Sequence, residues 1–197
     1  MNLRILLPIF FFLVSSLVVS CTSDDHSDEV NNDSAVTIME EPEISPEVEL
    51  ILRSDKNGAF RGMSLGMHRD TVLLKEDSIT MLNESPESLV YQLTYSPNQD
   101  VDIEYAFNNY SNLIKIQADL YPQSEAEHAR IFNELISYFK YRYGEPDFDS
   151  ENELRWKNRL GEFELILKAQ GNKKVKDIQI EFNPIIHTPS GMALLNK

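Results

Sequence analysis

Apolar and polar residues alternate strictly in the middle of the chain, which predicts three consecutive strands. Apolar side chains occupy every second position over residues 89–95, 101–107 and 114–120. The breaks between these runs, residues 96–100 and 108–112, are rich in Asn, Ser, Asp and Pro, which favour turns. Such period-two patterns are typical of an antiparallel sheet that packs one face on a core and leaves the other face in water.

The same pattern returns near the C-terminal end. Residues 163–169 alternate, a turn is predicted at 171–174, and residues 178–182 alternate again before Pro184. Residues 154–157 form a shorter candidate strand before them. The sequence therefore predicts a second group of three strands.

One helix separates the two groups of strands, and another precedes the first group. Ser124 and Glu127 have the spacing of a capping box, and Gly144 and Pro146 mark the end of that helix. Its apolar stripe holds Phe132, Leu135, Ile136, Phe139 and Tyr143, and its polar face holds Arg130, Asn133, Glu134, Ser137 and Lys140. A shorter helix is predicted over residues 69–76, with His68 at the cap position.

The element order, a helix and three strands twice, predicts an α+β fold. We expect a tandem αβββ repeat, with about six antiparallel strands and two helices on one face of the sheet. Over Phe60–Phe182 this order, with the helix start at residues 66–72, resembles the β-lactamase-inhibitor-protein type of fold. It is also similar to BamE-like lipoproteins, which have fewer strands. Neither resemblance implies a functional residue here.

An apolar run near the N-terminus ends at a cysteine and predicts a lipid anchor. After Arg4, the run from Ile5 to Val19 spans about 15 residues, short of the ~20 that a membrane-spanning helix needs, and is typical of a signal peptide. The sequence Val18-Val19-Ser20-Cys21 resembles the lipobox of bacterial lipoproteins. The resemblance implies diacylglycerol on Cys21, cleavage before it and acylation of the new amino end. The alternative is an uncleaved signal anchor.

Charge is uneven along the chain and predicts an acidic tether. Ten acidic residues and no Lys or Arg lie between Thr22 and Leu50, which leaves 22 acidic and 17 basic residues from Ile51 onward. Nucleic-acid binding is not expected, because no basic face is visible. The expected organisation is a signal peptide over residues 1–20, a disordered tether over 21–52, one domain over 53–186 and a loose tail over 187–197.

Two short patterns in the tether resemble signals of Bacteroidota lipoproteins. The acidic cluster after Cys21 resembles their surface-export signal, and Asp33-Ser34-Ala35 resembles their O-glycosylation motif, with Ser34 as the acceptor. The alternative for both is a solvated spacer. We do not expect a metal site at residues 24–29, because a flexible tether does not preorganise ligands.

Other motifs with chemical potential have simpler interpretations. Ser137-Tyr138-Phe139-Lys140 matches the Ser-x-x-Lys of penicillin-binding enzymes, but Ser137 lies deep in a predicted helix. Residues 147–153 alternate acids as a calcium loop does, but Asn152 replaces the required Gly. Cys21 is the only cysteine, and none of the four His has a partner at metal-ligand spacing. We expect no catalytic residue, metal or cofactor.

The tyrosines suggest an interaction surface. Tyr138 and Tyr141 lie off the apolar stripe of the second predicted helix, so we expect them to face outward as part of a binding surface. The alternative is packed rings with hydrated hydroxyls. We therefore expect a non-enzymatic, lipid-anchored protein of the outer membrane, facing the periplasm or the cell surface. It would bind an envelope protein or, alternatively, inhibit an extracytoplasmic enzyme; an enzyme using carboxylates and Tyr is a third class.

Overall fold

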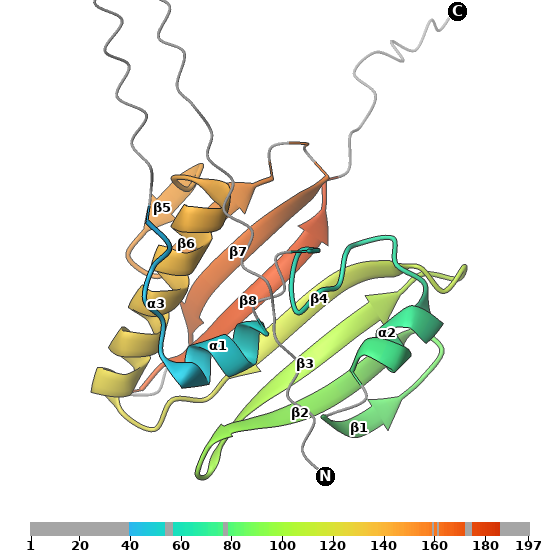
Figure 1. Cartoon of the computed structure of the whole chain (residues 1–197), viewed down its shortest axis with the longest axis horizontal. Helices are drawn as coiled ribbons and strands as arrows, with labels where there is room; N and C mark the ends of the chain where they lie inside the picture. Colours follow the sequence, from blue (N-terminus) through green and yellow to red (C-terminus); the bar gives the residue numbers. More distant parts are fainter. Residues whose placement is uncertain are drawn as a thin grey trace, which may run out of the picture. The chain divides into compact units, whose positions relative to one another are not determined.

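Strands with alternating buried and exposed side chains form one antiparallel sheet of eight strands (Figure 1). The computed structural model describes residues 40–53, 57–76, 79–158, 160, 162–171 and 175–185. The strands are β1 (Thr80–Glu84), β2 (Ser88–Ser96), β3 (Gln99–Phe107), β4 (Leu113–Leu120), β5 (Phe148–Ser150), β6 (Glu153–Lys157), β7 (Phe163–Gln170) and β8 (Asp177–Pro184). Their order across the sheet is β1-β2-β3-β4-β8-β7-β6-β5.

The α+β class and the antiparallel sheet are confirmed. Each of the six predicted strands is present within two residues at either end, as β2, β3, β4, β6, β7 and β8. The sheet also contains β1 and β5, which border it on either side. Every residue of β1 and β5 is exposed, so neither strand carries the alternation that revealed the others. Four strands therefore follow each of the two predicted helices, where three were expected.

Three helices are described, one more than expected. They are α1 (Pro46–Leu52), α2 (Arg69–Lys75) and α3 (Glu125–Tyr143). The predicted caps are confirmed: the His68 side chain accepts from Asp70 N at α2, and the Ser124 side chain accepts from Glu127 N at α3. Gly144 ends α3 with a φ of 89°, a left-handed conformation that glycine adopts without strain.

The core lies between the inner face of the sheet and the helices. Phe139 on α3 is fully buried, and its ring lies 5.8 Å from Trp156 of β6 and 6.3 Å from Phe182 of β8. Helix α1 lies against β2 and α3. Figure 1 shows α1 and α3 on the same side of the sheet. Side chains on the other side of the central strands are partly exposed, as expected for an open face.

The expected end of the tether at residue 52 is wrong. Residues 46–52 form α1, in which Val48 and Ile51 are fully buried. Ser45 caps this helix, and both its backbone N and its hydroxyl donate to Glu134 Oε2 on α3, at 2.8 and 2.6 Å. The acidic residues of this segment hid a helix whose cap and Pro46 at the first position are ordinary start signals. The folded region therefore begins before Pro46.

The carboxylate of Glu134 anchors this junction. Burial by itself would raise its pKa, but the two hydrogen bonds from Ser45 and the neighbouring Arg130 lower the pKa below its usual range. Arg130 Nη1 donates to Glu134 Oε1 at 3.0 Å and to the Ser45 hydroxyl at 2.8 Å. The charged form of Glu134 therefore holds the start of α1 on α3.

Candidate functional site

The residues singled out from the sequence separate in the structure. Cys21 and Ser34 lie outside the described residues. Tyr141 is exposed, as expected. The expectation that Tyr138 faces outward is wrong: it is 9% exposed, its ring packs edge-on against Phe139, and its hydroxyl accepts from Arg142. The two tyrosines therefore do not form one surface.

The open face of the sheet is a candidate surface. Pairing across the strands lines up outward positions in rows, such as Gln92, Asp102, Asp119, Gln179 and Lys168. In this row, Asp102 of β3 lies directly opposite Asp119 of β4. Like charges that face each other across strands destabilise a sheet, by roughly 0.2–1 kcal/mol.

Hydrogen bonds from neutral side chains hold these carboxylates in place. Asp119 Oδ2 accepts from Gln117 at 2.6 Å, and its Oδ1 accepts from Gln179 at 2.5 Å. Asp102 accepts from Gln92 at 3.2 Å and from the Tyr121 hydroxyl at 3.1 Å. Burial, followed by the charge of Asp102, raises the pKa of Tyr121 to about 12, so this hydroxyl remains a neutral donor at pH 7.

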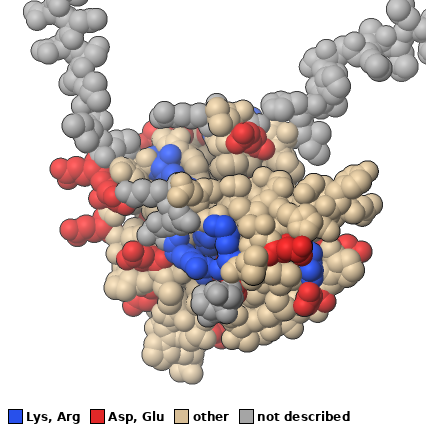
Figure 2. Space-filling model, turned by 45° about the vertical axis from the view of Figure 1, so that its right-hand side comes forward, with Lys and Arg blue, Asp and Glu red and all other residues tan. Residues whose placement is uncertain are grey.

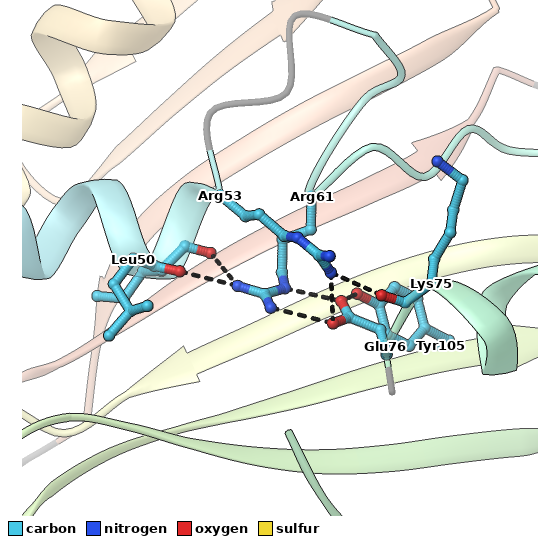
Figure 3. A network of polar contacts seen from close by, with 7 residues as sticks. Leu50, Arg53, Arg61, Lys75, Glu76 and Tyr105 are labelled. Atoms are coloured by element: carbon cyan, nitrogen blue, oxygen red, sulfur yellow. Dashed lines mark hydrogen bonds and ion pairs between the residues drawn. The ribbon is translucent and has the colours of Figure 1, made fainter. Parts of the chain in front are cut away.

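A second polar group is buried rather than exposed (Figure 3). Arg61 Nε and Nη2 donate to the two oxygens of Glu76, at 2.7 and 3.0 Å, and the Tyr105 hydroxyl donates to Glu76 Oε1 at 2.5 Å. Arg61 Nη1 also donates to the carbonyls of Leu50 and Ile51 at the end of α1. We call Arg61, Glu76 and Tyr105 the clasp, because it ties the ends of α1 and α2 to β3.

The clasp has the properties of a structural ion pair. The side chains of Glu76 and Arg61 are 0% and 3% exposed. Burial would lower the pKa of Arg61, but its bonds to Glu76 raise it, and burial with the Glu76 charge keeps the pKa of Tyr105 well above its usual range. Arg61 has a φ of 51° and Gly62 a φ of 75°, as in the tight hairpin turn of type I′. The bidentate pairing with Glu76 therefore fixes Arg61 in this turn, although its positive φ is unfavourable for a residue other than glycine.

One further arginine, Arg53, reaches the clasp from the surface. Figure 2 shows Lys and Arg side chains gathered near the middle of one face, with Asp and Glu side chains around them. In Figure 3, Arg53 approaches Glu76 from the side of the clasp, and its Nη1 donates to the Lys75 carbonyl at 2.6 Å. The Arg53 side chain is 45% exposed and the Glu76 side chain is 0% exposed. Arg53 therefore lies between the buried clasp and the solvent.

A groove of about 760 Å³ lies at the C-terminal end of α3. Its lining includes Arg142, Tyr143, Leu160, Glu162 and Phe163. The Arg142 guanidinium lies over the Tyr143 ring, 5.5 Å from its centre, and donates to Tyr138 and to the Gly58 carbonyl. These polar groups therefore hold the chain near Gly58 against α3, which favours a structural seam over a ligand site.

The remaining motifs lie in ordinary structural settings. The Ser137 hydroxyl donates to the Asn133 carbonyl within α3, and residues 147–153 cover β5 and the turn that leads into β6. The described residues contain no group of three or more His, Cys, Asp or Glu that could hold a metal ion. In the same part of the chain, no helix combines the length and the apolar character needed to cross a membrane.

The clasp was not found from the sequence. Glu76 is 15 residues from Arg61 and 29 from Tyr105, and no periodicity connects them. The only local signal was a turn-forming Gly62 after an arginine. Comparison with known proteins adds nothing to this geometry: no family model, no curated protein and no solved structure matches the chain.

Proposed function

We propose that this chain is a lipid-anchored, non-enzymatic protein of the cell envelope that binds a protein partner through the open face of its sheet. The lipobox-like Val18-Val19-Ser20-Cys21 supports the anchor. The roughly 25 residues between Cys21 and α1 would reach about 80–90 Å when fully extended. The folded region would lie on the periplasmic side or at the cell surface.

The single observation that carries the binding role is the open face. Six neighbouring strands, β2, β3, β4, β8, β7 and β6, present outward side chains that no described helix covers. Partners that bind sheet faces use such rigid, pre-ordered side chains, which lose little conformational entropy on binding. The buried clasp and the seam at Arg142 use their polar groups internally and offer no comparable surface.

We further propose that the two halves of the sheet are copies of one repeat. The strand order is symmetric about the β4–β8 pair, and in each half four strands follow one helix, α2 in the first half and α3 in the second. An inhibitor of an extracytoplasmic enzyme is the second candidate, because an open sheet face would equally cover the rim of an active site. The identity of the captured partner separates the two: one soluble enzyme for an inhibitor, a membrane complex for a scaffold.

The anchor is tested by replacing the lipidated residue. Cys21→Ala should abolish incorporation of a radioactive fatty acid and leave the precursor uncut at this site, because the thioether can no longer form. Label that persists on the alanine variant would contradict the lipoprotein assignment.

The binding role is tested by photo-cross-linking in living cells. A photoreactive amino acid at Ile166, an outward position on β7 that faces Arg155 and Glu181, should give a discrete adduct with a protein partner. The matched control places it at Asn133, exposed on α3. Equal adducts from both positions, or none from Ile166, would show that the open face does not carry the partner.

A further inference from the structure

The groove of about 760 Å³ at the C-terminal end of α3 leaves apolar side chains in contact with solvent, and we call it the end groove. Leu160 in its lining is 78% exposed. Leu65, Tyr143 and Phe163 also line it and are only partly buried, although each packs against the core. The end groove therefore offers an apolar surface that the described part of the chain does not cover fully.

Polar side chains of the end groove already have hydrogen-bond partners within the fold. The Tyr143 hydroxyl donates to the Ala59 carbonyl at 3.2 Å. Asn158 Oδ1 accepts from the backbone N of Glu162 at 2.6 Å, and Asn158 Nδ2 donates to Glu162 Oε2 at 3.3 Å. Arg142 is used in the two contacts described above. An occupant of the end groove would therefore be held mainly through its apolar surface.

The chain leaves the sheet beside this groove. β8 ends at Pro184, and the backbone N of Ile185 donates to the Glu162 carbonyl at 3.2 Å. Glu162 itself lines the end groove. The segment that follows, residues 186–197, lies outside the described residues. Its point of attachment is therefore at the groove, whatever path it takes afterwards.

The sequence of this segment holds an apolar group within reach of the groove. Residues 192–195, Met-Ala-Leu-Leu, are consecutive and uncharged. The chain from Ile185 to Met192 could span at most about 25 Å. Pro189 and Gly191 lie between the two and favour a change of chain direction. The apolar group can therefore turn back to the place where the segment is attached.

We propose that residues 192–195 of this chain dock in the end groove and cover Leu160 and Phe163. An uncharged segment suits a groove whose polar groups are engaged, because it needs no new ion pair there. A short spacer holds a segment near its site at an effective concentration on the order of millimolar, so weak apolar contacts suffice. A volume of about 760 Å³ lies within the range of sites that enclose a small ligand. The inference depends neither on the lipid anchor nor on the open face.

The test is a cross-link within one chain. An apolar photoreactive amino acid replaces Leu194 in the full-length chain, which is expressed and irradiated in cells. Mass spectrometry of the purified chain should then find an adduct between residue 194 and the peptide that contains Leu160 and Phe163. The adduct should migrate with the mass of a single chain.

Two leucines of equal exposure provide the variant and its matched control. Leu160→Asp places a charge in the apolar surface of the end groove and should lower the yield of the adduct at least fivefold. Leu74→Asp changes a leucine on α2 that is also 78% exposed, and its yield should stay within about twofold of the parent. Neither substitution removes a buried side chain, so both variants should fold.

A reciprocal measurement leaves the remaining lining of the groove intact. With the photoreactive amino acid at Leu160, adducts to residues 192–195 should form within one chain. Leu194→Asn together with Leu195→Asn should lower their yield at least fivefold, because the apolar side chains that enter the groove are lost.

Other products would overturn the inference. An adduct of twice the mass of the chain would assign residues 192–195 to a second copy, and an adduct with a different protein would assign them to a partner. Equal yields from Leu160→Asp and Leu74→Asp, or no adduct within one chain, would show that the segment does not dock in the end groove. The proposed binding role is tested separately at Ile166, so it can fail or hold independently.

Discussion

Replacing Glu76 with glutamine is expected to lower the free energy of unfolding by about 3–5 kcal/mol. The substitution keeps the size and shape of the side chain but leaves the Arg61 guanidinium, 3% exposed, without its counter-charge. Breaking one partner of a buried ion pair is costly because the remaining charge cannot return to water. Urea melts followed by the fluorescence of Trp156, the single tryptophan, measure the effect.

The control for the clasp is Arg53→Ala. Arg53 also approaches Glu76, at 3.5 Å, but its side chain is 45% exposed. Exposed ion pairs contribute about 0–1 kcal/mol, so this variant should lose no more than that. If Glu76→Gln were as mild as Arg53→Ala, the clasp would have to be hydrated, contrary to the burial described above.

The hydrophobic counterpart of the clasp is a separate test. Replacing Arg61 by Met, Glu76 by Leu and Tyr105 by Phe together should cost far less than Glu76→Gln alone, because no buried charge is left unpaired. A triple variant as unstable as the single one would indicate that the shape of the clasp, rather than its charge balance, holds α1, α2 and β3 together.

Truncating Phe139 to alanine should lower the free energy of unfolding by about 3–5 kcal/mol. Its ring is fully buried and lies within 6.3 Å of the ring centres of Tyr138, Tyr143, Trp156 and Phe182. The cavity would open where α3 meets β6 and β8, and the surrounding rings cannot collapse fully into it. The urea midpoint should fall accordingly.

The adjacent Lys140→Ala is the matched control on the same helix. Lys140 pairs with Glu145 at 2.7 Å, but the two side chains are 31% and 73% exposed. The loss should therefore be below about 1 kcal/mol. Comparable losses from Phe139→Ala and Lys140→Ala would mean that α3 buries a different face.

The burial of Tyr138 shows where the helical pattern of α3 stops being informative. The stripe from Phe132 to Tyr143 predicts one buried face of the helix, and Tyr138 lies off that stripe. In the structure, α3 is covered by the sheet on one side and reached by the Arg142–Gly58 contact on another, so its buried arc is wider. A pattern records one dominant partner of a helix and cannot reveal a second one.

Local sequence patterns predicted the strands whose side chains alternate and the helices that have a cap. Alternation over β2, β3, β4, β7 and β8 arises because each of these strands has one buried and one open face, and the capping box of α3 depends on residues three apart. Such signals are complete within a few residues of sequence. The sequence by itself therefore determined the fold class, most strands and the limits of α2 and α3.

Tertiary structure decided the features that depend on distant segments. β1 and β5 are strands because a neighbour pairs with them, since their own side chains are all exposed. Helix α1 is helical within an acidic segment because β2 and α3 bury its Val48 and Ile51. The clasp and the opposition of Asp102 and Asp119 exist only once the strand register is set, because the energy of burial and of charge depends on which surfaces meet in space.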